Sequence, residues 1–202
     1  MYTDALSHLR GCDPVMATII DRVGDCRFAP MAEGTHYEAL LRSIIYQQLS
    51  GRAAATIHGR FVALYPRRAP TAQRVLGTSD EVLRSVGLSR QKIGYIRDLS
   101  RKVASRELPV RTLHTLDDDA IVESLVRVKG IGRWTAQMFL MFRLGRPDVL
   151  PELDLGIQKA IQLNWRKRKL PKPADVLKIG KPWAPYRSIA SWYLWRSLET
   201  RD

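Results

Sequence analysis

Residues 128–136 read VKGIGRWTA, which is the most informative local pattern in the chain. Two glycines one residue apart, Gly130 and Gly132, permit a positive φ and a very tight turn between two helices. The backbone N–H groups of such a turn can approach an anion closely, and the following helix directs the positive end of its dipole to the same place. Lys129 and Arg133 add positive charge. The stretch predicts a helix–hairpin–helix element that binds phosphate without reading base sequence. An ordinary turn with a glycine cap is the common alternative.

The chain on both sides of this element is patterned as helices. Apolar residues recur at three- and four-residue spacing, and no alternating β-branched run or Asn-Gly hairpin signal appears. We therefore predict an all-α protein of about ten helices. Thr78 and Glu81 read as a capping box for one of them. The expected helices cover residues 35–49, 53–64, 82–86, 90–104, 117–128, 133–144, 174–179 and 188–198, with another that begins near residue 154.

Charge and cysteine content restrict the class of partner and of site. The 202 residues carry 33 Lys and Arg against 20 Asp and Glu, a net charge of +13, which favours a polyanionic partner such as nucleic acid. The two cysteines form no C-x-x-C pair, and the four histidines lack metal-ligand spacing, so we expect no metal site. No stretch has the apolar length of a membrane helix or of a secretory signal, and we expect a soluble, intracellular protein.

Four segments carry a family resemblance, and they stand in the family's order. They read SIIYQQLS (residues 43–50), KGIGRWTA (129–136), LPELDLGI (150–157) and WAPYRSIA (183–190). Together they resemble the helix-hairpin-helix–GPD superfamily of DNA base-excision glycosylases, in particular the 3-methyladenine DNA glycosylase II branch in a short form without its N-terminal β domain. The resemblance implies a two-lobed helical bundle with an active-site cleft between the lobes. It also implies double-stranded DNA containing damaged bases as the partner.

The resemblance assigns the catalytic role to Asp154. This aspartate follows a proline loop and precedes an apparent helix, which makes it a natural N-cap. A helix N-terminus stabilises an anion, and a carboxylate there can stabilise the positive charge that develops on a sugar when its bond to a base breaks. It can also orient or deprotonate water. A purely structural cap is the alternative, and Glu152 is the rival acid.

Trp134 stands where the strand-cutting members of the resembling family carry a lysine nucleophile. A lysine forms a Schiff base with the sugar, which an indole cannot do. Lys129 and Arg133 flank this position without occupying it. We therefore predict a monofunctional glycosylase that leaves an abasic site, and the bifunctional mechanism is the alternative.

Aromatic residues are the candidates for the pocket of an extruded base. Trp134 and Trp195 match pocket positions of the resembling family, although filling of the core is the common role of any one tryptophan. An electron-rich ring face attracts a cationic alkylated purine by about 0.5–2 kcal/mol. Met138 replaces an aromatic residue of one type of relative, which leaves the substrate range open. Tyr46 is a further candidate.

Further residues are candidates for contact with DNA. Gln48 or Leu49, at the end of an apolar helix, could insert as the wedge that fills the space of the extruded base, or could be an ordinary surface and core residue. Arg187 and Ser188 could bind phosphate or hold the pocket loop, and Thr135 continues the hairpin. The resemblance allows a monovalent cation on the backbone carbonyls of the hairpin, and we expect no other cofactor.

These observations combine into one expected organisation. Residues 36–145 form a helical lobe that carries the helix–hairpin–helix at about 117–144, and residues 1–35 with 146–202 form the lobe that carries the aspartate loop. The expected activity is hydrolysis of the N-glycosidic bond of alkylated bases of the 3-methyladenine type, in base excision repair. We expect a monomer in the cytoplasm, associated with the nucleoid if the source is bacterial. The alternatives are a non-enzymatic helix–hairpin–helix DNA-binding module, and a glycosylase for deaminated or oxidised bases.

Overall fold

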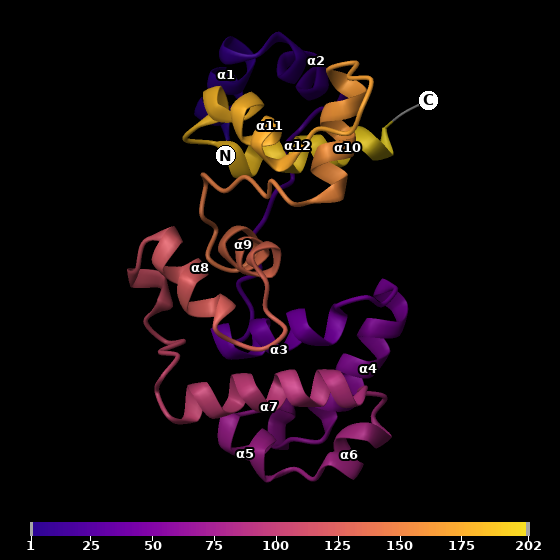
Figure 1. The fold of residues 1–202 in the computed structure, drawn as a ribbon, viewed down its shortest axis with the longest axis vertical. Coiled ribbons are helices and arrows are strands. Elements are labelled where there is room, and N and C mark those ends of the chain that lie inside the picture. Colours follow the sequence, from indigo (N-terminus) through magenta and orange to yellow (C-terminus); the bar gives the residue numbers. More distant parts are fainter. Residues whose placement is uncertain (1, 201–202) are drawn as a thin grey trace. The chain divides into compact units, whose positions relative to one another are not determined.

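The computed structural model describes residues 2–200, and every regular element in that range is a helix (Figure 1). This confirms the predicted all-α class. Three short 3-10 helices lie between the α-helices: η1 (Pro66–Arg68), η2 (Leu113–Thr115) and η3 (Lys181–Trp183). The α-helices are α1 (Thr3–Cys12), α2 (Pro14–Val23), α3 (His36–Tyr46), α4 (Gly51–Ala63), α5 (Ala72–Gly77), α6 (Asp80–Ser85), α7 (Arg90–Ala104), α8 (Asp118–Val126), α9 (Arg133–Phe142), α10 (Leu155–Asn164), α11 (Pro173–Ile179) and α12 (Arg187–Glu199). None of the helices in the described range is long and apolar enough to cross a membrane.

Short polar side chains begin most of these helices. The Thr35 hydroxyl accepts a hydrogen bond from the Glu38 N–H (3.2 Å), and the Glu38 carboxylate accepts one from the Thr35 N–H (2.6 Å), so α3 opens with a capping box. Asp13 caps α2 directly before Pro14, a residue that suits the first helical position. The other side-chain N-caps are Ser50, Thr71, Ser79, Ser89, Asp117 and Asp154.

The predicted capping box of Thr78 and Glu81 is wrong. The Thr78 hydroxyl donates to the Arg74 carbonyl (2.9 Å) and thereby closes α5. Ser79 is the N-cap of α6, since its hydroxyl accepts from the Val82 N–H (3.3 Å). Three helices, α1, α2 and α5, were not among the expected ones, although the Asp13–Pro14 pair is a helix-start signal that marks α2.

The chain divides into two compact units. Unit 1 comprises residues 1–31 and 140–202, and unit 2 comprises residues 32–139. The boundaries predicted from the sequence are 35/36 and 145/146. The later boundary of the compact units falls inside α9, because this helix continues past the last residue of unit 2.

In unit 2, α7 is the central helix. It packs against α3 on one side and against α5 and α6 on the other (Figure 1). Its buried face carries Ile93, Ile96 and Leu99, each at most 3% exposed, at the three-residue spacing of one helix face. This arrangement makes α7 the element that the other helices of the unit share.

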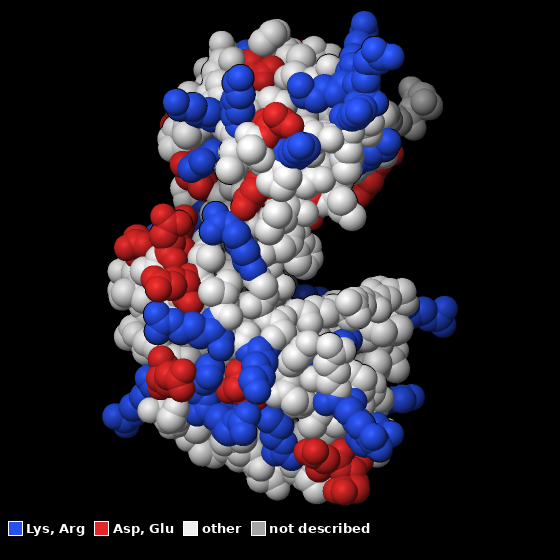
Figure 2. Space-filling view, viewed as in Figure 1, with Lys and Arg blue, Asp and Glu red and all other residues white. Residues whose placement is uncertain are grey.

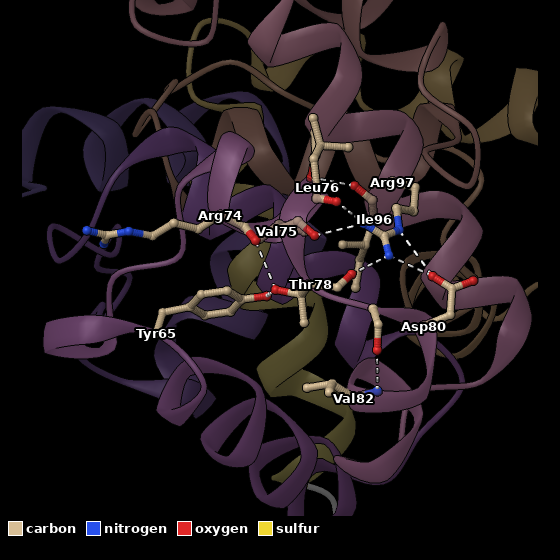
Figure 3. A network of polar contacts seen from close by, with 11 residues as sticks. Tyr65, Arg74, Val75, Leu76, Thr78, Asp80, Val82, Ile96 and Arg97 are labelled. Atoms are coloured by element: carbon tan, nitrogen blue, oxygen red, sulfur yellow. Dashed lines mark hydrogen bonds and ion pairs between the residues drawn. The ribbon is translucent and has the colours of Figure 1, made fainter.

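Arg97 on α7 holds the connection between α5 and α6 (Figure 3). Its guanidinium donates to the carbonyls of Val75 (2.9 Å), Leu76 (2.7 Å) and Thr78, and to the carboxylate of Asp80 (2.7 Å). The first two carbonyls belong to the last turn of α5, where a helix has no internal donors left. One side chain therefore satisfies the end of α5 and fixes the start of α6.

In unit 1, α12 is the central helix and packs against α2 and α10. Ile189, Tyr193 and Leu194 on α12 are buried, and the Tyr193 hydroxyl donates to the Gly24 carbonyl (2.8 Å) at the end of α2. The Trp183 side chain is fully buried, and its indole N–H donates to the Asp13 carboxylate (3.0 Å). The N-terminal and C-terminal parts of the chain therefore share one core.

Candidate nucleic-acid interface and active site

The predicted hairpin lies between α8 and α9 in unit 2. Gly130 has φ +83°, and a Cβ atom at this residue would lie 2.1–2.6 Å from three atoms of the Tyr95 ring. Glycine is therefore required here both by the backbone conformation and by the close approach of the ring. Lys129 and Arg133 are exposed on either side of the turn. The exposed Gly132 directly precedes α9, whose first-turn N–H groups have no partner within the helix.

Two side chains from other elements of unit 2 hold this hairpin. The buried carboxylate of Asp98, on α7, accepts a hydrogen bond from the Lys129 N–H (2.9 Å). The side-chain amide of Gln47 donates to the Gly130 carbonyl (2.8 Å). The sequence motifs did not predict a role for either residue. Asp98 carried a signal that could have identified it, since it is an acid close to the apolar positions of α7.

The candidate wedge residues lie in the turn that joins α3 to α4. Gln48 and Leu49 are both exposed, and Leu49 keeps 39% of its surface accessible, so Leu49 is not part of the core. Gln48 adopts φ +55°, a left-handed conformation that is uncommon for a residue with a side chain. Tyr46, the last residue of α3, is partly exposed, and the Arg42 guanidinium lies over its ring, 4.1 Å from the centroid.

The start of α9 presents one of the two candidate pocket tryptophans. Trp134 is 42% exposed and Met138, one turn later, is partly exposed. The rest of α9 has the buried character that the sequence indicated, with Ala136 and Met141 fully buried. Thr135 is only 6% exposed, so its side chain is poorly placed to contact DNA directly.

Asp154 lies in unit 1, at the N-terminus of α10, as the sequence predicted. Its Oδ1 accepts two hydrogen bonds, from the Ile157 N–H (2.9 Å) and from the indole N–H of Trp195 on α12 (2.9 Å). The Trp195 ring stacks on Phe142, with centroids 5.9 Å apart and 30° between the planes. The carboxylate is thus fixed by its own helix and by Trp195, for which the sequence predicted only a role in the base pocket.

The surroundings of Asp154 differ from those of the rival acid. Glu152 is 6% exposed, whereas Asp154 is partly exposed and stands between two exposed leucines, Leu153 (47%) and Leu155 (70%). Of the two carboxylates, Asp154 is the more accessible to an outside molecule.

Arg187 and Ser188, at the start of α12, hold the loop that precedes the aspartate. Arg187 forms a bidentate ion pair with Asp148 (2.6 and 2.8 Å). Burial by itself would raise the pKa of the Asp148 carboxyl, but the hydrogen bonds and charge of Arg187 outweigh it and lower the pKa below its ordinary value. The Ser188 hydroxyl is fully buried, donates to the Arg146 carbonyl (2.6 Å) and accepts from the Val149 N–H (3.0 Å). The buried Ser188 hydroxyl therefore supports the loop, which is the second of its two predicted roles, and is not accessible to DNA.

Positive charge is distributed over both units. Lys and Arg outnumber Asp and Glu in each unit, and Figure 2 shows them spread over the visible face while the acidic side chains form separate groups. Among residues 2–200, no group of three or more His, Cys, Asp or Glu side chains could hold a metal ion. The absence of a cofactor and the monovalent cation at the hairpin stay predictions.

Comparison with known proteins identifies the family. A family model described as HhH-GPD superfamily base excision DNA repair protein matches residues 41–185. DNA-3-methyladenine glycosylase 1 of Schizosaccharomyces pombe is 34% identical over 203 residues, which cover 99% of this chain and 89% of that protein.

Two solved structures agree with this match. The 3-methyladenine DNA glycosylase of S. pombe in complex with abasic DNA has a TM-score of 0.86 at 34% identity, over 95% of each chain. A DNA-3-methyladenine glycosidase from Bacillus halodurans has a TM-score of 0.84 at 34% identity, over 95% of this chain and 87% of that one. The family inferred from the four sequence segments is confirmed: the chain belongs to the HhH-GPD superfamily of base excision DNA repair proteins.

Proposed function

We propose that this protein is a monofunctional DNA glycosylase that hydrolyses the bond between an alkylated base, of the 3-methyladenine type, and its deoxyribose in double-stranded DNA. The observation that carries the proposal is the fixed carboxylate of Asp154, with two donors on Oδ1. The relatives named as 3-methyladenine glycosylases over nearly the whole chain support the substrate class. A DNA substrate implies that the protein acts in the compartment that contains DNA.

The reaction needs little more than electrostatics and a positioned water molecule. As the N-glycosidic bond breaks, its electron pair leaves with the base and positive charge develops on the sugar. The Asp154 carboxylate stabilises that charge, and a water molecule then adds to the anomeric carbon. The proton that this water loses passes to the carboxylate or to solvent. The products are the free base and an abasic site.

Residues of unit 2, which carries the hairpin, fit the steps in which the protein binds DNA and the extruded base. Lys129, Arg133 and the N–H groups at the start of α9 provide contacts to phosphate that do not depend on base sequence. Trp134 is 42% exposed, and the role assigned to its ring is to stack on an extruded cationic base. Because residue 134 is not a lysine, it forms no Schiff base, and we expect borohydride to trap no covalent adduct with DNA. A trapped adduct would contradict the monofunctional mechanism.

The test is release of bases from methylated duplex DNA by the wild type and by Asp154→Asn. Asparagine is as good an N-cap as aspartate, so the variant keeps α10 and loses only the charge. We expect its rate to fall by roughly 100-fold or more. Asp117→Asn is the matched control, since Asp117 caps α8 in the same way (2.8 Å to the Ala120 N–H). This control should retain the wild-type rate.

Two outcomes would overturn parts of the proposal. If the wild type releases no more base than Asp154→Asn, the enzymatic function fails and the DNA-binding module is favoured. If Glu152→Gln abolishes release while Asp154→Asn does not, the catalytic carboxylate is Glu152. Comparison of 3-methyladenine, 7-methylguanine, 1-methyladenine, hypoxanthine and uracil as substrates separates the alkylated class from the deaminated class, and 8-oxoguanine tests the oxidised class.

A further inference from the structure

Lys92 on α7 has an unusual position for a lysine. Its ammonium donates to two backbone carbonyls, those of Ile45 and Gln47, at 2.7 Å each. Both carbonyls lie at the end of α3, where the helix provides no internal donors. Lys92 therefore holds the end of α3 from a neighbouring helix, and burial in this position lowers its pKa.

The same turn is tied to the hairpin on its other side. Gln47, whose carbonyl accepts from Lys92, donates its side-chain amide to the Gly130 carbonyl (2.8 Å). Gln47 is also directly followed by Gln48 and Leu49, the candidate wedge residues, and Gln48 has the left-handed φ of +55°. The backbone on one side of the wedge is thus fixed by two long-range contacts.

The hairpin in turn rests on α7. The Tyr95 ring lies directly beneath Gly130, and Asp98 accepts from the Lys129 N–H. Lys92, Tyr95 and Asp98 stand three residues apart in sequence, which places them on one face of α7. A single helix face therefore contacts both the wedge-bearing turn and the phosphate-binding hairpin.

We propose that Lys92 and Gln47 are positioning residues that hold the Gln48–Leu49 turn in a fixed place relative to the hairpin. When the hairpin binds the DNA backbone, the wedge residue is then inserted into the duplex in the same step. This inference rests on the proposed function, because it assigns a task to residues of the same DNA-binding surface. It differs from a purely structural role in one respect: it predicts a defect specific to opening of the duplex. Removal of either contact should leave phosphate binding in place and impair the extrusion of a paired base.

The first measurement needs no catalysis. A duplex carries a stable tetrahydrofuran abasic analogue with 2-aminopurine opposite it, and an inserted wedge unstacks the 2-aminopurine and raises its fluorescence. Lys92→Met and Gln47→Ala should bind this duplex with nearly the wild-type affinity but lose most of the fluorescence rise. Gln48→Ala and Leu49→Ala show which residue is the wedge. Because no base is released, this result is independent of whether the protein is a glycosylase.

The second measurement compares single-turnover base release from two duplexes. In one, the alkylated base is paired, and in the other it lies opposite an abasic analogue and is already unpaired, which lowers the cost of extrusion. Lys92→Met and Gln47→Ala should slow release from the paired site by roughly 10-fold to 100-fold, since small displacements of positioning groups have effects of this size. Release from the unpaired site should change far less. Lys92→Arg, which keeps a donor, should recover part of the rate.

Arg90→Met is the matched control, because it removes one exposed basic side chain from the same turn of α7. It should behave as the wild type in the fluorescence rise and in the ratio of the two release rates. The proposal is overturned if Lys92→Met and Gln47→Ala retain the full fluorescence rise, or if both release rates fall in equal proportion. If Lys92→Met does not fold, Gln47→Ala, which deletes one amide contact, decides alone.

Discussion

At the scale of single residues, Gly156 shows how closely the site around Asp154 is packed. A Cβ atom at Gly156 would lie 3.0 Å from Asp154 Oδ1 and 3.0 Å from Trp195 Cδ1. Only a residue without a side chain lets the indole reach the carboxylate without displacement of one of them. The hydrogen bond from Trp195 to Asp154 therefore depends on glycine at position 156.

Replacement of Trp195 tests what this hydrogen bond contributes. Trp195→Phe keeps an aromatic ring against Phe142 and removes the N–H that fixes Asp154. We expect kcat to fall by roughly 10-fold to 100-fold while KM changes little, because the carboxylate loses its orientation and the binding surface remains. Steady-state kinetics of base release measure this split. A rise in KM alone would show that the ring acts only in binding the base.

The two hairpin glycines should respond differently to the same substitution. Gly130→Ala meets the Tyr95 ring and a positive φ, so we expect a loss of about 2–4 kcal/mol in the free energy of unfolding. At Gly132 nothing lies within 4 Å of an added Cβ, and we expect a loss below about 1 kcal/mol together with weaker binding to abasic DNA. Denaturant unfolding and a binding titration measure both. Equal losses of stability would contradict this assignment.

At the scale of elements, Arg97 joins three helices of unit 2 through one side chain (Figure 3). Arg97→Met removes the side-chain donor from the carbonyls of Leu76 and Thr78 and leaves the Val75 carbonyl with the Thr78 N–H alone (3.3 Å). We expect the free energy of unfolding to fall by about 2–4 kcal/mol. Asp80→Asn is the control: the Asp80 side chain is 62% exposed, and an exposed ion pair contributes about 1 kcal/mol or less. Thermal or denaturant unfolding measures both variants. An equal loss in both would assign the effect to the ion pair.

At the scale of the whole molecule, the net charge of +13 predicts DNA affinity that falls steeply with salt. The slope counts only the charges that contact phosphate, so Lys129→Met should reduce it by about one unit. Lys178→Met removes the same charge from an exposed position on α11 and should leave the slope unchanged. Titrations at several salt concentrations measure the slopes. Equal slopes for wild type and Lys129→Met would exclude Lys129 from the phosphate contacts.

Features that depend on neighbouring residues were predictable from the sequence alone. Helical periodicity, the glycine pair of the hairpin and the N-cap at Asp154 are local, because backbone conformation and capping involve residues within a few positions of each other. The exchange of Thr78 for Ser79 as the cap of α6 shows the limit even there, since two adjacent hydroxyls compete for one role.

The distant side chains that support these local features became visible only in the packed structure. Three hydrogen-bonded pairs are far apart in the sequence: Trp195 and Asp154 by 41 positions, Lys92 and Gln47 by 45, and Gln47 and Gly130 by 83. Such pairs depend on how helices pack, and no periodicity of a single helix encodes them. The burial of Ser188, which gives its hydroxyl a role in the loop and not in DNA contact, is likewise a result of packing. The glycines and the aspartate could be read from the chain, whereas the contacts that hold them exist only once the helices have packed.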